Sequence, residues 1–188
     1  MSITPRQGLN ARQTETVERL LAAGDEELRT VGHDGLTIRT VASRAGVSPA
    51  TAYTYFASRN HLFAELFLRR LVTDPGPGPT GDSAVARLQS VTRFMANQLA
   101  ESPELAAAVT MALLGSDPEV DRLRLEIGTE FVERFRAAIG PGADPRVLEA
   151  LVLAFSGALL QAGMGLMTYT EMGTRLDSVV AVVMEGNT

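Results

Sequence analysis

The segment from residue 37 to residue 56 constrains the fold more than any other part of the chain. Thr37 is placed to cap a short helix that stops at Gly46, where a residue free to adopt positive φ is needed. Ser48 is placed to cap a second short helix, with Pro49 at the first position, where a missing N–H costs nothing. Two short helices joined by a tight glycine turn predict a helix-turn-helix.

The charge of this region favours a nucleic-acid partner although the whole chain is acidic. Its 188 residues carry 17 basic and 22 acidic side chains, a formal net charge of −5. Residues 1–73 hold 9 arginines and 7 acids, whereas residues 74–188 hold 8 arginines and 15 acids. The stretch from Gly35 to Ala64 contains three arginines and no acid. This distribution predicts a surface suited to DNA phosphates in the N-terminal part.

Apolar residues repeat at three- and four-residue steps along the chain, which predicts helices and no strands. The expected helices span about 12–30, 38–45, 49–56, 58–73, 85–100, 103–114, 118–139, 145–169 and 175–185. The segment Asp74 to Asp82 holds three prolines and three glycines, so it is expected to be a linker. The sequence predicts an all-α chain: a three-helix helix-turn-helix domain at 1–58, a connecting helix at 59–73, and a C-terminal helical domain at 83–188.

The chain offers little material for catalysis. It has no cysteine and two histidines, so we expect no disulfide, no thiol nucleophile and no metal site. G-x-S-x-G, a Cys/His pair, an acidic metal cluster and a P-loop are all missing from the sequence, so we expect no enzyme activity and no cofactor. The run Asp25-Glu26-Glu27 is expected to be a solvated helix end. The N-terminus, MSITPRQGLNARQ, lacks a basic region followed by an apolar one, which predicts a cytoplasmic protein.

An uncharged stretch of 21 residues, Ala150 to Thr170, is long enough to cross a bilayer. Charged residues lie at one end without an aromatic belt, and polar residues interrupt the run, so we expect a buried dimer helix and no membrane partner. A helix exposing this much apolar surface would be a liability in a monomer. The sequence therefore predicts a homodimer formed through residues 145–169 and 175–185.

The helix-turn-helix segment resembles the TetR family of bacterial regulators, and the resemblance covers residues 12 to 72. It rests on four segments: Leu36-Thr37-Ile38-Arg39, Ala42-Ser43-Arg44-Ala45-Gly46-Val47-Ser48, Tyr53-Thr54-Tyr55-Phe56 and Ser58-Arg59. The resemblance implies a transcriptional regulator whose second motif helix enters the major groove of a double-stranded operator. The DNA-binding residues expected from motif and resemblance are Thr37, Arg39, Ser48, Ala50, Thr51, Tyr53, Thr54, Tyr55 and Arg59.

The resemblance also implies that the C-terminal helices form a dimer and a ligand pocket. Adaptable methionine and aromatic side chains are suited to line such a pocket. The expected ligand-binding residues are Phe94, Met111, Phe131, Phe135, Phe155 and Met164. We therefore expect a repressor released from a palindromic operator by a small apolar or amphipathic effector, such as a lipid or sterol derivative. The alternative is a helix-turn-helix regulator with no small-molecule ligand.

Overall fold

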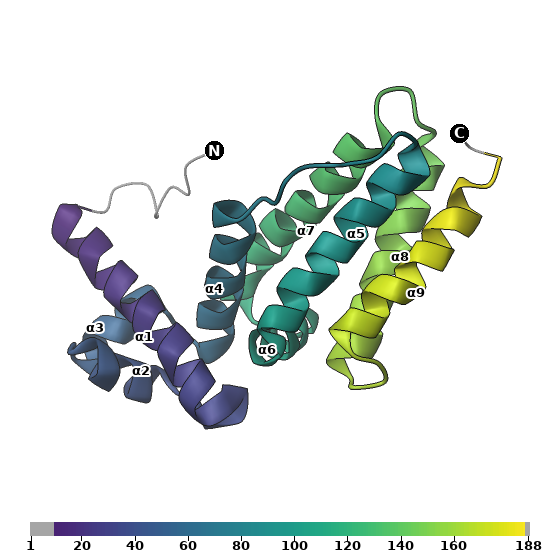
Figure 1. The fold of residues 1–188 in the computed structure, drawn as a ribbon. Helices are drawn as coiled ribbons and strands as arrows, with labels where there is room; N and C mark the ends of the chain where they lie inside the picture. Colours follow the sequence, from purple (N-terminus) through teal and green to yellow (C-terminus); the bar gives the residue numbers. More distant parts are fainter. Residues whose placement is uncertain (1–9, 187–188) are drawn as a thin grey trace.

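The computed structural model describes residues 10–186, which form nine helices and no strand (Figure 1). The helices are α1 (Ala11–Gly35), α2 (Ile38–Ala45), α3 (Pro49–Tyr55), α4 (Arg59–Thr73), α5 (Ala84–Glu101), α6 (Pro103–Leu114), α7 (Pro118–Ile139), α8 (Pro145–Gly163) and α9 (Tyr169–Met184). The prediction of an all-α fold is confirmed. The two domains expected from the sequence include residues 1–9 and 187–188, which lie outside the described residues.

Helices α1, α2 and α3 pack together at one end of the molecule, and we call residues 11–55 the reading head. Helix α4 stands between the reading head and helices α5 to α9 (Figure 1). The core of the reading head is apolar: Leu20, Leu36, Val41 and Ala52 are each at most 1% exposed. This arrangement confirms an N-terminal helix-turn-helix domain followed by a C-terminal helical domain.

Helix α1 continues beyond its predicted end near Thr30 and stops at Gly35. Gly32 has a φ of 71° and a ψ of 176°, so the helix kinks there and then resumes for a short turn. Only glycine adopts this backbone conformation at little cost, and the kink therefore falls at this residue. The first turn is fixed by Asn10, whose side chain accepts from the Gln13 backbone N–H at 3.0 Å.

Helix α4 contacts both parts of the molecule through different residues. Leu62 packs on α1, because a Cβ placed on Gly24 would lie 3.1 Å from Leu62 Cδ2. Leu71, near the other end of α4, is buried and its carbonyl oxygen accepts from Arg134 of α7 at 2.6 Å. The apolar side of α4 therefore packs partly on the reading head, through Leu62, and partly on the C-terminal helices. The helix is a shared element rather than part of one domain.

The last two helices have different bounds from those predicted. Helix α8 ends at Gly163 instead of near residue 169, and α9 begins at Tyr169 instead of near residue 175. Gly165 has a φ of 75°, which turns the chain. Thr168 then starts α9, because its side chain accepts from the Glu171 N–H at 3.1 Å and the Glu171 carboxylate accepts from the Thr168 N–H at 2.7 Å.

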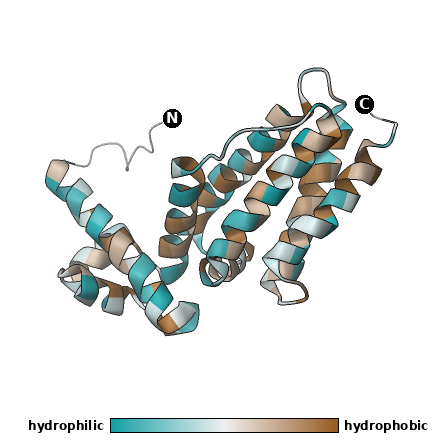
Figure 2. Ribbon diagram, in the orientation of Figure 1, coloured by the Kyte–Doolittle hydropathy of each residue, from teal (hydrophilic) through white to brown (hydrophobic). Residues whose placement is uncertain are grey.

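Helices α8 and α9 lie at the edge of the molecule farthest from the reading head, and apolar residues continue along both (Figure 2). Helix α8 is long and apolar enough to cross a membrane by length and composition alone. Only 22% of its most apolar window is buried within the chain. Leu153 of α8 is 67% exposed and Val182 of α9 is 70% exposed. The two helices thus present apolar side chains that nothing within residues 10–186 covers.

Aromatic side chains connect α4 to the interior of the C-terminal helices. The rings of Phe67 and Phe131 have centroids 6.2 Å apart, and Phe131 lies 5.1 Å from Phe155 of α8. Phe155 also meets Phe135 edge to face at 5.5 Å. These tilted and edge-to-face contacts are the geometries that aromatic pairs favour. The connecting helix is therefore continuous with the aromatic core behind it.

Candidate nucleic-acid interface and ligand pocket

The turn of the helix-turn-helix is built around Gly46. This residue is in the left-handed region, with a φ of 67° and a ψ of 35°. The following Val47 N–H donates to the Ala42 carbonyl oxygen at 3.0 Å, which satisfies one of the free carbonyls at the end of α2. Arg19 of α1 donates to the carbonyl oxygens of Ala45 and Gly46 and so holds the turn against the first helix. The angle between α2 and α3 is fixed by these contacts.

The second motif helix, α3, buries Ala52 and exposes Tyr53 and Thr54. Ser48 accepts from the Thr51 N–H at 3.1 Å and caps the helix, as the sequence predicts. Ala52 is fully buried against α2, whereas Tyr53 is 46% exposed. The resulting outer face is narrow and hydroxylated, which suits a major groove about 12 Å wide.

The DNA-binding residues predicted from the sequence come from α2, α3 and the start of α4. Most are exposed: Thr37, Arg39, Ser48, Ala50, Tyr53, Thr54 and Arg59. Thr51 and Tyr55 are half-buried. Arg59 donates to the carbonyl oxygens of His33 and Asp34 at 3.4 and 3.5 Å, which is longer than an ordinary N–H···O bond, so these carbonyls hold the guanidinium only weakly.

An ion pair inside the reading head was not predicted. Glu27 is buried, and its carboxylate accepts from Arg44 Nε at 2.7 Å. Asp25 also has partners, Arg29 and Arg70. The expectation of a solvated helix end at residues 25–27 is therefore wrong for two of its three acids. The sequence does contain an indication that Glu27 is buried, because this residue lies on the same helical face as Leu20 and Gly24.

The ion pair also predicts an acid-sensitive reading head. The bond from Arg44 holds the pKa of Glu27 below its ordinary value, although burial opposes this. A depressed folded-state pKa gives stability that is present above the unfolded pKa of about 4.3 and is lost as the pH falls through the folded pKa. Glu27→Gln should cost about 1–3 kcal/mol at neutral pH and remove this contribution to acid unfolding.

Glu26→Gln is the matched control, because Glu26 is exposed and its contact with Arg29 is 3.2 Å long. Its stability should stay within about 0.5 kcal/mol of the wild type. Urea unfolding between pH 3 and pH 7 would measure both variants. If the two glutamines give the same pH profile, the buried ion pair has no special role.

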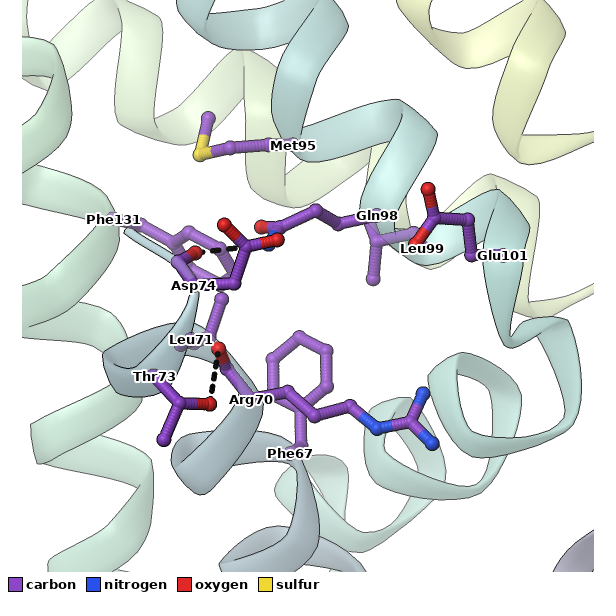
Figure 3. A pocket seen from close by; sticks show the side chains of 10 residues that line it. All are labelled: Phe67, Arg70, Leu71, Thr73, Asp74, Met95, Gln98, Leu99, Glu101 and Phe131. Carbon is purple, nitrogen blue, oxygen red and sulfur yellow. Dashed lines mark hydrogen bonds between the residues drawn. The ribbon is translucent and has the colours of Figure 1, made fainter. Parts of the chain in front are cut away.

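A pocket of about 230 Å³ lies between α4, α5 and α7 (Figure 3). Its walls are largely apolar and its rim is polar: Phe67, Arg70, Leu71, Thr73, Asp74, Met95, Gln98, Leu99, Glu101 and Phe131. The Phe67 ring stands in the middle of these side chains, with Arg70 extending past it on one side and Asp74 and Gln98 on the other (Figure 3). Thr73, Asp74 and Glu101 are exposed, so this is a surface pocket and not an enclosed cavity.

The structure does not bring the six predicted ligand-binding residues into one site. Only Phe131 lines this pocket. Phe135 and Phe155 are core residues, and Phe94 packs against the linker, since a Cβ on Gly76 would lie 2.5 Å from its ring. Two methionines do not line an interior cavity: Met111 is 61% and Met164 is 55% exposed. Sequence periodicity alone cannot distinguish such outward positions from the core on helices that are apolar on several sides.

These features define a protein that binds DNA through a helix-turn-helix. Residues 20–66, which run from α1 into α4, match the family of bacterial regulatory proteins, tetR family. The chain is 46% identical over 179 residues to an uncharacterized HTH-type transcriptional regulator of Mycobacterium tuberculosis, covering 94% of this chain and 84% of that protein. The chain therefore belongs to the TetR family and is a DNA-binding transcriptional regulator.

More distant relatives extend the comparison. The HTH-type transcriptional repressor KstR of Rhodococcus jostii is 29% identical over 117 residues, 59% of this chain and 55% of KstR. A TetR transcriptional regulator from Rhodococcus sp. RHA1 has a TM-score of 0.77 at 21% identity, covering 93% of this chain and 97% of that one. Thermus thermophilus FadR, crystallised with lauroyl-CoA, has a TM-score of 0.65 at 20% identity over 91% and 94% of the two chains. These two structures share the fold.

Proposed function

We propose that this regulator is a cytoplasmic homodimeric repressor that binds a palindromic operator. The observation that carries the proposal is the outer face of α3, which is held against α2 and exposes Tyr53, while Arg39 of α2 and Arg59 of α4 are exposed as well. On this proposal the nine predicted residues contact DNA, with Thr37 and Arg59 at phosphates and Tyr53 at base edges. The N-terminal reading domain would span 1–58, the connecting helix 59–73 and the C-terminal domain 83–188.

The proposed dimer interface consists of α8 and α9. Exposed apolar side chains lie on both helices, Leu153 on α8 and Val182 on α9. Small residues along α8 permit the close approach of a second copy. A two-fold axis between two copies would place two reading heads on one side of the DNA, which matches an inverted repeat. The same burial would keep the apolar helix α8 away from a membrane.

The proposed effector is a small apolar or amphipathic molecule that lowers operator affinity. The pocket beside α4 supports this, since α4 contacts the reading head through Leu62 and lines the pocket through Phe67 and Leu71. Fold relatives include a regulator crystallised with lauroyl-CoA, and a sequence relative is named a repressor. The alternative, a regulator without a small ligand, is favoured if no apolar molecule binds this pocket.

Substitutions at two predicted DNA contacts test the DNA-binding surface. Tyr53→Ala should weaken binding to the specific operator by about 1–3 kcal/mol and leave nonspecific binding nearly unchanged. Arg59→Ala should weaken binding to all DNA sequences. It should also reduce the slope of the logarithm of the binding constant against the logarithm of salt concentration by about 1, as expected for the loss of one phosphate contact. Fluorescence anisotropy with operator and scrambled duplexes, at several salt concentrations, would measure both effects.

The operator duplex for this experiment would be selected from genomic DNA fragments with the wild-type protein. Arg136→Ala is a control, because Arg136 lies at the C-terminal end of α7 and pairs with Glu133, away from the reading head. It should bind DNA like the wild type. Equal losses on operator and scrambled DNA for Tyr53→Ala and Arg59→Ala would contradict the roles assigned to the two residues.

A further inference from the structure

Arg70 of α4 belongs to the pocket and to the contact with the reading head at the same time. Its guanidinium lines the pocket beside Phe67 (Figure 3). One of its amino groups donates to the Asp25 carboxylate of α1, and the other donates to the hydroxyl of Ser102 at the start of α6. One side chain therefore connects the reading head, the connecting helix, the C-terminal helices and the pocket.

The Arg70 guanidinium still has donors to offer. A guanidinium carries five N–H groups, and the contacts with Asp25 and Ser102 use two of them. The side chain is 39% exposed and lines the pocket, so a rotation of the guanidinium can direct the remaining donors toward a ligand there. Arg70 is also the only cationic residue among those that line this pocket. A ligand group that accepts hydrogen bonds thus has one obvious partner.

The two acidic residues that line the pocket, Asp74 and Glu101, do not block the approach of an acceptor group to Arg70. Gln98 Nε2 donates to the Asp74 carbonyl oxygen at 2.9 Å and to its carboxylate at 3.0 Å, so Asp74 is held at the linker. Glu101 is exposed on the rim, where water and salt screen its charge. The walls beyond Arg70 are formed by the apolar side chains Phe67, Leu71, Met95, Leu99 and Phe131. This arrangement suits an apolar body with an acceptor group at one end.

Asp25 does not depend on Arg70 alone. Its other carboxylate oxygen pairs with Arg29, one turn further along α1. Burial raises the pKa of Asp25, but the bonds from Arg29 and Arg70 together hold it below its ordinary value. If Arg70 turned to a ligand, Asp25 would keep its charge and one partner. The bond between α1 and α4 can therefore be exchanged without leaving a buried charge unpaired.

We propose that Arg70 transmits occupancy of the pocket to the reading head, by exchanging its bond to Asp25 for one to a carboxylate or carbonyl group on an apolar ligand. The inference rests on the proposed function and specifies both the ligand class and the positioning residue. The ligand prefers the state in which the bond between Arg70 and Asp25 is broken. Because a ligand shifts an equilibrium only by its differential affinity, this preference is what lowers operator affinity.

The experiment uses three probes with the same short chain: decanoate, decanol and decylamine, each below its micelle concentration. A short chain is chosen because the pocket, about 230 Å³, is smaller than most ligand sites. Isothermal titration calorimetry would measure binding, and anisotropy with the selected operator would measure release. Wild-type protein should bind decanoate at least about tenfold more tightly than decylamine, because a charge-assisted bond forms with Arg70.

Two pairs of variants separate this role from plain structural support. Arg70→Gln should abolish the preference for decanoate over decylamine. Asp25→Asn should lower the affinity for the operator in the absence of ligand. Decanoate should then lower the operator affinity of Asp25→Asn by less than twofold. The controls are Arg69→Gln and Glu18→Gln, since Arg69 pairs with Glu18 across the same two helices, is 38% exposed and is not part of the pocket lining. Both controls should keep the wild-type preference and release.

The outcomes are distinct from one another. If decylamine binds as tightly as decanoate, or if Arg70→Gln retains the preference, the inference is wrong. If decylamine or decanol nevertheless releases the operator, the proposed effector control stands without this role for Arg70. If no probe binds the wild-type protein while it still binds its operator, the inference is overturned and a ligand-free regulator is supported. A wild-type protein that binds no operator would contradict the proposed function itself.

Discussion

Leu153→Asp is expected to convert the protein from a dimer into a monomer and to lower operator affinity by about 100-fold or more. Leu153 is 67% exposed in the single chain and lies on the outer face of α8. In the proposed dimer this face is buried, so the carboxylate would lose its hydration without gaining a partner. A monomer would bind only one half-site of the operator, so the affinity that comes from two linked reading heads binding together would be lost.

Sedimentation velocity at micromolar protein concentration would measure the change in oligomeric state, and anisotropy with the full palindrome would measure the affinity. Leu125→Asp is the matched control, because Leu125 is 73% exposed but lies on α7, outside α8 and α9. This variant should remain dimeric. A monomeric wild-type protein would contradict the proposed dimer. A monomeric Leu125→Asp variant alongside a dimeric Leu153→Asp variant would show that the interface has been assigned to the wrong helices.

The parts of the fold that the sequence predicted well are those set by local chemistry. Thr37 and Ser48 cap the helices that they were expected to cap, and Gly46 adopts the left-handed conformation that a tight turn needs. Such signals depend on a few neighbouring residues, so they can be recognised without knowledge of the fold. The helix ends near residues 163 and 169 were misplaced because an uninterrupted apolar run hid the turn at Gly165.

The pocket was not predictable in the same way. Its lining is assembled from α4, the linker, α5 and α7, and no short segment contains the pattern. Phe131 was expected there because it is a large apolar residue, but so were Met111 and Met164, which the structure places on the surface. The polar members Arg70 and Gln98 gave no signal along the chain, because what distinguishes them is the set of partners that the fold brings to them.

Phe135→Ala should have the largest effect on stability, a loss of about 3–5 kcal/mol in the free energy of unfolding. Phe135 is 1% exposed and its ring meets that of Phe155, so truncation removes a favourable aromatic contact and leaves a cavity between α7 and α8. Urea unfolding would measure the loss. Because dimerisation contributes to stability, all variants must be compared at one protein concentration.

Phe94→Ala provides the comparison, since Phe94 is half-buried and packs against the linker at Gly76. A side chain that leaves part of its surface in water loses less on truncation, and a linker can move into the vacated space, so we expect a cost of about 1–2 kcal/mol. The difference between the two variants reports how rigid the aromatic core is behind α4. If Phe135→Ala costs no more than Phe94→Ala, the core adjusts to the lost ring, and the contacts from Phe67 through Phe131 to Phe155 cannot hold α4 in one position.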